Sequence, residues 1–162
     1  MVRLSKLSDY AVVVLMRLQA TRPGGVQTAP GIAQVTGLAE PTVAKVLKQL
    51  AQAGLVSSTR GARGGYALAR PLSSVSIADV IAAVEGPLAI AACVDGATDV
   101  CECEETCQVR GRWDMVNNAI REALAAITLG DMLERALPAG LHVAPAAQAL
   151  RAAAPLAASA AE

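Results

Sequence analysis

All four cysteines of this 162-residue chain lie within one stretch, CVDGATDVCECEETC at 93–107. They are Cys93, Cys101, Cys103 and Cys107. Thiols this close together can surround a soft metal centre, because thiolates favour zinc, Cu(I) and iron-sulfur clusters. Structural zinc sites usually combine two separated C-x2-4-C pairs, and only Cys103 and Cys107 come close to that spacing. A long irregular loop with three or four thiolates therefore favours an iron-sulfur cluster over zinc.

Acidic residues stand among these cysteines: Asp95, Asp99, Glu102, Glu104 and Glu105. Negative charge beside a thiol raises its pKa, and it would lower the reduction potential of a bound cluster. The same side chains could instead simply solvate an exposed loop. We favour this second interpretation.

The composition does not indicate a membrane protein, although 54% of the residues are hydrophobic. The longest aliphatic run, AVVVLM at 11–16, is far shorter than the roughly 20 residues that cross a bilayer. We therefore expect a cytoplasmic protein without membrane contact. In that compartment thiols stay reduced, so clustered cysteines bind metal or sense redox rather than form structural disulfides.

Three helices are predicted in the first third of the chain. Apolar spacing indicates one over 8–20, with Ser8 as its cap, and a short one over 28–37 ended by Gly37. A third follows over 38–54, with Pro41 in its first turn and Gly54 after its last turn. Its inner face is formed by Val43, Val46, Leu47 and Leu50. The last two helices, joined by a tight turn, form a helix-turn-helix.

A basic hairpin follows directly. The runs LVSST at 55–59 and YALAR at 66–70 are strand-like, and RGARGG joins them. Another helix is predicted over 73–86, capped by Ser76 and ended by Gly86. This order predicts a mainly α fold with a small β-hairpin wing, a winged helix-turn-helix.

A further amphipathic helix of about 15 residues is predicted within 112–133, after the cysteines. Its apolar positions recur every three to four residues: Met115, Val116, Ile120, Leu124 and Ile127. A helix that follows a complete small domain commonly packs on a partner, so we expect a long dimerisation helix. The alternative is that it folds back on its own domain.

The charge is divided between the two halves of the chain. Residues 1–70 carry nine Lys and Arg against two acidic residues, a net +7, and residues 71–162 carry five against twelve, a net −7. Such asymmetry suggests a polyanion-binding half joined to an acidic half; the alternative is chance scatter of surface charge.

The basic half offers residues suited to DNA. A recognition helix presents polar and basic side chains to the major groove, and arginines among wing glycines can enter a narrow minor groove. We predict these DNA contacts: Thr42, Lys45, Lys48, Gln49, Arg60 and Arg63. For the helix residues alone, the alternative is an ordinary solvated face.

Enzymatic chemistry finds little support. The only histidine, His142, lies in the Ala/Pro-rich stretch 138–162, which we predict to be a disordered tail. RGARGG lacks the Lys-Ser/Thr of a phosphate-binding loop. We therefore expect no enzyme.

Four features together resemble the Rrf2 family of bacterial transcription regulators. They are RLSKLSDYAV at 3–12, the wing at 55–70, the C-x7-C-x5-C set and ITLGDML at 127–133. The resemblance covers about residues 1–135, and CECEETCQVRGRWDMVNNAI is most similar to the branch that regulates SUF iron-sulfur assembly. It implies a winged-helix homodimer that binds a pseudo-palindromic DNA operator.

The resemblance also implies that Cys93, Cys101 and Cys107 are thiolate ligands of an iron-sulfur cluster, with 2Fe-2S favoured over 4Fe-4S. The fourth ligand departs from the IscR branch, which has a histidine where this chain has Arg110. The NO-sensing NsrR branch instead uses an aspartate from the other subunit, and Asp9 matches it. Cys103 is the other candidate, and we lean slightly to Asp9.

The expected organisation has four parts. These are a winged-helix DNA-binding domain at 1–88, a cysteine-rich loop at 89–110, a dimerisation helix and following segment at 111–137, and the tail at 138–162. The expected function is repression of iron-sulfur assembly genes in response to cluster status. Alternatives are a repressor that senses nitric oxide or redox state, and a scaffold or cofactor-delivery protein with an acidic docking loop.

Overall fold

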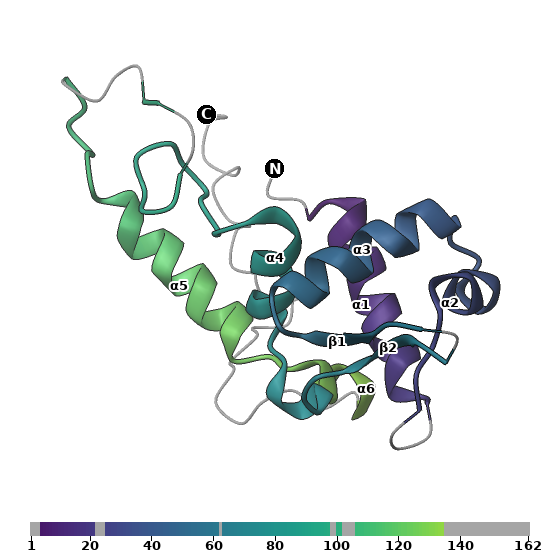
Figure 1. The fold of residues 1–162 in the computed structure, drawn as a ribbon. Coiled ribbons are helices and arrows are strands. Elements are labelled where there is room, and N and C mark those ends of the chain that lie inside the picture. The colour runs from purple at the N-terminus through teal and green to yellow at the C-terminus, as the bar shows by residue number, and fades with distance from the viewer. Residues whose placement is uncertain (1–3, 22–24, 62, 98–99, 102–105, 135–162) are drawn as a thin grey trace, which may run out of the picture.

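The computed structural model describes residues 4–21, 25–61, 63–97, 100–101 and 106–134 (Figure 1). Its helices and strands follow in this order: α1 (Lys6–Gln19), α2 (Ala29–Thr36), α3 (Glu40–Gln52), β1 (Val56–Thr59), β2 (Gly65–Leu68), the 3-10 turn η1 (Leu72–Ser74), α4 (Ile77–Glu85), α5 (Trp113–Ala125) and α6 (Leu129–Glu134). The order helix-turn-helix, hairpin, helix is that of a winged helix, as predicted. The predicted tail at 138–162 lies outside the described residues.

Helix α1 begins earlier than the sequence suggested, so the prediction of Ser8 as its cap is wrong. Ser5 is the cap, in extended conformation, and its hydroxyl oxygen accepts a hydrogen bond from the Ser8 backbone N–H at 3.3 Å. Either serine could cap a helix, but Ser8 is only 2% exposed and faces α4. Tertiary contact therefore decides which serine caps the helix.

The helix-turn-helix forms as its sequence indicates. Thr28 caps α2 by accepting from the Gly31 N–H, and Gly37 closes the helix in the left-handed conformation at φ 73°. In α3 the predicted inner face is fully buried, comprising Val43, Val46, Leu47 and Leu50. The opposite face of α3 is thus left to solvent.

Strands β1 and β2 form an antiparallel hairpin in which Val56 is opposite Leu68 and Thr59 is opposite Gly65. The segment before α2 joins its edge, because Gln27 and Tyr66 exchange two backbone hydrogen bonds of 2.9 and 2.8 Å. A side chain at Gly65 would bring its Cβ within 2.8 Å of the Gln27 carbonyl oxygen. Glycine is therefore needed there for the hairpin to lie against the helix-turn-helix.

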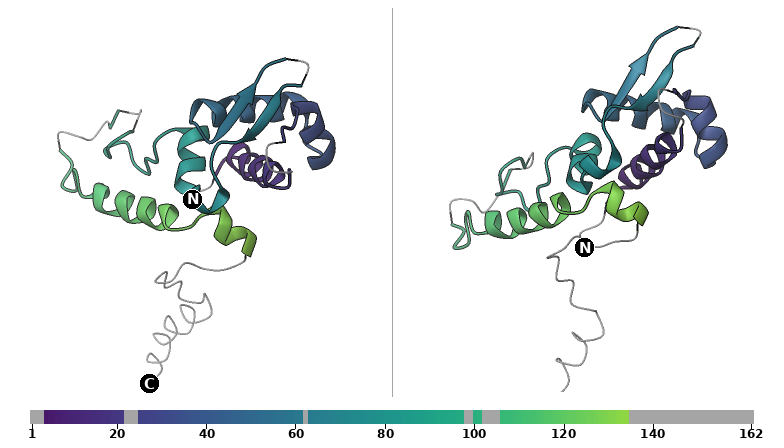
Figure 2. Two further views of the ribbon diagram at one scale, coloured as in Figure 1. Left: turned by 60° about the horizontal axis from the view of Figure 1, so that its bottom comes forward. Right: turned by 90° about the horizontal axis from the view of Figure 1, so that it is seen from below.

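Helix α4 is shorter than the predicted 73–86, because residues 72–74 form the separate turn η1, but its ends are as predicted: Ser76 caps it in a capping box with Asp79, and Gly86 follows its last residue. After α4 the chain leaves the winged helix, and the cysteine-containing segment runs beside α5, which projects from the body (Figures 1 and 2). This arrangement attaches the cysteine segment to the DNA-binding domain through the end of α4.

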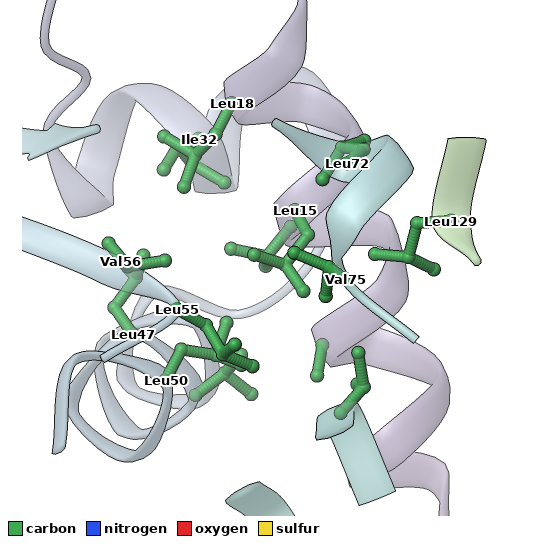
Figure 3. Close-up of a cluster of buried hydrophobic side chains, with 14 of the residues drawn as sticks. Leu15, Leu18, Ile32, Leu47, Leu50, Leu55, Val56, Leu72, Val75 and Leu129 are labelled. Atoms are coloured by element: carbon green, nitrogen blue, oxygen red, sulfur yellow. The ribbon is translucent and has the colours of Figure 1, made fainter. Parts of the chain in front are cut away.

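Helix α5 is shorter than its periodicity suggested, since it ends at Ala125 and Ile127 lies beyond it. There the chain is tied back to the domain, because the Ile77 N–H donates to the Ile127 carbonyl oxygen at 2.9 Å. Leu129 of α6 is fully buried in the same cluster as Leu72 and Val75 (Figure 3). Burying a leucine contributes roughly 1.5–3 kcal/mol. The segment after α5 therefore packs into the winged-helix core through Leu129.

Candidate nucleic-acid interface and cysteine segment

The outer face of α3 presents the residues expected of a recognition helix. Lys45 and Lys48 are exposed and Thr42 is half-buried. They lie on the helix that follows the tight turn, with Pro41 in its first turn. Two cationic side chains on an exposed recognition helix are suited to phosphates and to the acceptor edge of guanine.

The wing carries two exposed arginines, Arg60 and Arg63, in the connection between β1 and β2. Gly61 between them has a φ of 110°, a backbone conformation that residues other than glycine rarely adopt. A Cβ on Gly64 would come within 2.3 Å of the Thr59 carbonyl oxygen. The glycines thus form a tight tip from which both arginines extend to solvent.

Among the described residues, no carboxylate forms a salt bridge with the cations of α3 or of the wing tip. Within the ranges that the structure describes, the salt bridge present joins Arg70 to Asp79 at 2.9 Å. Lys45, Lys48, Arg60 and Arg63 therefore remain available to a polyanion.

Gln49 has a different environment from the lysines of α3. It is half-buried, and its Nε2 donates to the Val84 carbonyl oxygen of α4 at 3.2 Å. Its Oε1 is buried without a hydrogen-bond partner. Helical spacing alone predicts that Gln49 lies on the outer face of α3. In the structure, however, α4 packs beside Gln49 and its Val84 carbonyl binds the Gln49 amide. The structure therefore does not bring Gln49 together with the exposed lysines.

The cysteine segment connects α4 to α5, and its described residues form turns rather than helix or strand. Cys93, Cys101 and Cys107 are free thiols and half-buried, while Cys103 lies outside the described residues. The loop folds back on itself at Gly96, where a Cβ would be 2.8 Å from the Cβ of Pro87. Three reduced thiols in one irregular segment have the donor chemistry of an iron-sulfur site.

The three described thiols do not converge on a common metal position. No three His, Cys, Asp or Glu side chains within the described ranges gather closely enough to hold a metal ion. Metal binding commonly brings together ligands that are separate in the metal-free chain, because a preformed ligand set rarely exists before the metal binds. The donor set thus fits an iron-sulfur cluster in its chemistry.

Two residues of α5 hold the beginning of the cysteine segment, and neither was among the predicted site residues. Asn117 is only 1% exposed, and its Oδ1 accepts from the Ile90 N–H at 3.2 Å. Asp114 accepts from the Asp95 N–H at 3.4 Å. A signal was available, because Asn117, Ile120 and Leu124 share one helical stripe, and a polar residue on an apolar stripe needs a buried partner.

Asp9, a candidate fourth ligand, is exposed in the first turn of α1. It borders an apolar groove with a volume of about 1090 Å³ between α1, α4, α6 and the end of α5. The groove is lined in part by Leu4, Val12, Ile81, Leu124 and Met132. Within the described part of a single chain, Asp9 does not join two cysteines in a metal-binding group.

Glu85, the last residue of α4, reaches the beginning of α1. Its Oε1 accepts from the Ser5 N–H at 3.0 Å and from the Ser8 hydroxyl. The hydrogen bond from Ser8 is the main reason that the pKa of Glu85 lies below its ordinary value of 4.5, against a smaller opposing effect of burial. The carboxylate therefore ties α4 to the N-terminus of α1, where negative charge also complements the helix dipole.

A helix-turn-helix with a basic hairpin beside it defines a winged-helix DNA-binding protein. The model of the Rrf2 family, described as an iron-dependent transcriptional regulator, matches residues 4–135, and the chain belongs to this family. The family is described as one of transcriptional regulators and the relative CymR is named a transcriptional regulator, so this is a family of regulators and not of enzymes. No helix within the described ranges is both long and apolar enough to cross a bilayer.

Relatives and solved structures agree with this assignment. The chain is 33% identical to protein aau3 of Rhizobium meliloti (strain 1021), over 82% of this chain and 85% of that one. It is 30% identical to the HTH-type transcriptional regulator CymR of Bacillus subtilis (strain 168), over 80% and 88% of the two chains.

Two solved structures share the fold over most of their length. That of CymR, titled the global cysteine regulator of B. subtilis, has a TM-score of 0.63 at 30% identity, over 83% of this chain and 98% of that chain. That of T. potens IscR has a TM-score of 0.59 at 31% identity, over 83% and 88%.

Proposed function

We propose that this regulator represses iron-sulfur cluster assembly genes and senses cluster status through Cys93, Cys101 and Cys107. The observation that carries the proposal is three free, half-buried thiols on one irregular segment attached to a winged helix. Support also comes from the family's description as iron-dependent and from the likeness to an IscR structure. The protein acts in the cytoplasm, where its thiols stay reduced.

The cluster we propose is 2Fe-2S rather than 4Fe-4S. Its fourth ligand is Asp9 of a second copy, or else Cys103. A bound cluster would supply an iron centre at this site. The site would gain the centre when clusters are abundant and lose it when they are scarce. The residues of the chain then provide three thiolates and a segment that closes around them.

The protein works as a homodimer on double-stranded operator DNA. Val116 and Met115 of α5 are 40% and 75% exposed, an apolar surface that a second copy would cover. In the dimer, Lys45 and Lys48 of each α3 enter the major groove, with Thr42 beside them, and Arg60 and Arg63 contact the flanking DNA.

Anaerobic purification tests the cluster. The wild-type protein should be brown with visible absorption, and Cys93→Ala should remove that absorption while leaving the far-ultraviolet circular dichroism unchanged. A colourless wild-type protein with stoichiometric zinc would overturn the proposal. Random-sequence DNA enriched on the wild-type protein then supplies the operator duplex for the experiments below.

A second candidate function is sensing of nitric oxide or redox state by the same cysteines. The observation that favours it is that the thiols are free and half-buried, together with the likeness to a structure titled a cysteine regulator. Titration of nitric oxide and of peroxide against operator binding separates the two functions. Loss of DNA binding at one equivalent of nitric oxide would favour this second function.

A further inference from the structure

The last two residues of α4 are held by two different helices. The Val84 carbonyl oxygen accepts from the Gln49 Nε2 of α3 at 3.2 Å. The next residue, Glu85, accepts from the Ser5 N–H of α1 at 3.0 Å and from the Ser8 hydroxyl. We call Val84 and Glu85, with these three partners, the α4 junction.

The α4 junction lies between the two functional parts of the chain. Gly86 follows it directly and begins the segment that leads to Cys93, eight residues after Glu85. On the other side, Gln49 belongs to the same helix as the exposed Lys45 and Lys48. A displacement at the beginning of the cysteine segment can therefore reach the recognition helix in two ways. One is direct, through the Gln49–Val84 hydrogen bond, and the other runs through α1, which Glu85 contacts and which packs on α3.

The hydrogen bonds are of the kind that resists displacement. The Glu85 carboxylate is charged and accepts two donors, and charge-assisted bonds are about twice as strong as neutral ones. Ser8 is almost completely buried, so its hydroxyl would lose its partner if α4 moved. The Gln49 Oε1 is already buried and unpaired, so losing the Nε2 bond as well would leave the whole amide unsatisfied.

We infer that Gln49 and Glu85 are positioning residues that couple the cysteine segment to the recognition helix, and that Gln49 does not read DNA. That this coupling carries a signal from the cysteines rests on the proposed sensing function. The coupling itself does not require a bound cluster. Coupling between two sites is reciprocal, so operator binding must also stabilise the beginning of the cysteine segment.

Hydrogen exchange tests this reciprocity in the full-length, cluster-free protein. Amides of residues 86–97 are followed by mass spectrometry with and without the operator duplex. In the wild type, DNA should slow their exchange about fivefold or more, the lower end of typical coupling factors. Gln49→Ala and Glu85→Gln should each abolish this slowing, at DNA concentrations that saturate every variant.

Matched controls lie on exposed surfaces nearby. Gln52→Ala changes the last residue of α3, and Glu122→Gln removes an exposed carboxylate of α5. Both should retain the wild-type response. Ser8→Ala provides a second way to weaken the Glu85 contact if Glu85→Gln folds poorly.

The possible results are distinct. The inference is wrong if DNA leaves exchange at 86–97 unchanged in the wild type, or if the α4-junction variants keep the full slowing. It is equally wrong if Gln49→Ala lowers operator affinity while the slowing persists, because Gln49 would then be a DNA contact. A colourless protein that passes this test would overturn the proposed cluster function and leave the coupling intact.

Discussion

At the residue scale, the surroundings of each cation decide what it can do. Arg70 is engaged by Asp79, whereas Arg60 extends from the glycine-rich tip of the wing. Arg60→Ala should therefore weaken operator binding. It should also reduce the slope of log Kd against log salt concentration by about one, as expected for the loss of one phosphate contact. Thermal stability should change little, because exposed substitutions usually stay within about 0.5 kcal/mol.

Fluorescence anisotropy at several salt concentrations measures both quantities. Arg121→Ala, on the exposed surface of α5, is the control and should leave affinity and salt slope unchanged. An unchanged slope for Arg60→Ala would remove the wing from the DNA interface.

Also at the residue scale, the lowered pKa of Glu85 makes a prediction about acid stability. Because hydrogen bonding from Ser8 holds the folded pKa below the ordinary 4.5, ionised Glu85 stabilises the folded state. This contribution is present in full above the unfolded pKa and is lost as the pH falls through the folded value. Glu85→Gln should thus have a lower Tm than wild type near neutral pH, and the gap should close as the pH falls below 4.5 and through the lowered folded pKa.

Thermal denaturation followed by circular dichroism across this pH range measures the gap. Glu122→Gln removes an exposed carboxylate and should show no comparable gap at any pH. A difference between Glu85→Gln and wild type that stays constant with pH would show that the carboxylate charge does not stabilise the fold.

At the element scale, the cysteine segment depends on α5 for its anchorage. Asn117→Ala removes the acceptor of the Ile90 N–H in a buried position, and such losses cost about 1–3 kcal/mol. We expect a lower free energy of unfolding and faster exchange at the Ile90 amide. The adjacent Asn118 is exposed, so Asn118→Ala should change neither. Equal effects of the two substitutions would contradict the assigned role of Asn117.

The elements also show how far local sequence determines this fold. The α2–α3 turn, the hairpin and α4 follow from glycines, caps and apolar spacing, all of which act over a few residues. The start of α1 was misplaced, because Ser5 and Ser8 are equally good caps and only the contact with Glu85 separates them. The bend after Ala125 was missed for the same reason, since it forms where Ile127 and Leu129 return to the core.

The site was less predictable than the fold. The four predicted cationic DNA contacts are exposed, as expected: Lys45, Lys48, Arg60 and Arg63. Their exposure was predictable because it follows from helical periodicity in α3 and from the glycines of the wing. The orientation of Gln49 was not predictable, since it depends on α4, which is 35 residues away in sequence. Ligation by Cys93, Cys101 and Cys107 stays a prediction, because it involves a group that the chain alone does not contain.

At the scale of the whole molecule, the exposed apolar surfaces of this chain are where the proposed second copy would pack. Val116 lies on the projecting helix α5, and the groove beside Asp9 is lined by apolar side chains from α1, α4 and α6. Val116→Glu should raise the dimer dissociation constant about tenfold or more, because a buried carboxylate without a partner is costly. Operator affinity should fall in parallel, since two linked recognition helices read two half-sites.

Sedimentation equilibrium with and without the operator duplex measures both effects. Asn118→Glu adds the same charge to an exposed residue about 200° further around α5, and it should leave the dimer intact. Circular dichroism must show that both variants remain folded, so that weaker association reflects the interface. If Val116→Glu dimerises as tightly as wild type, α5 packs only on its own domain, and the operator is bound through a different pairing of the two chains.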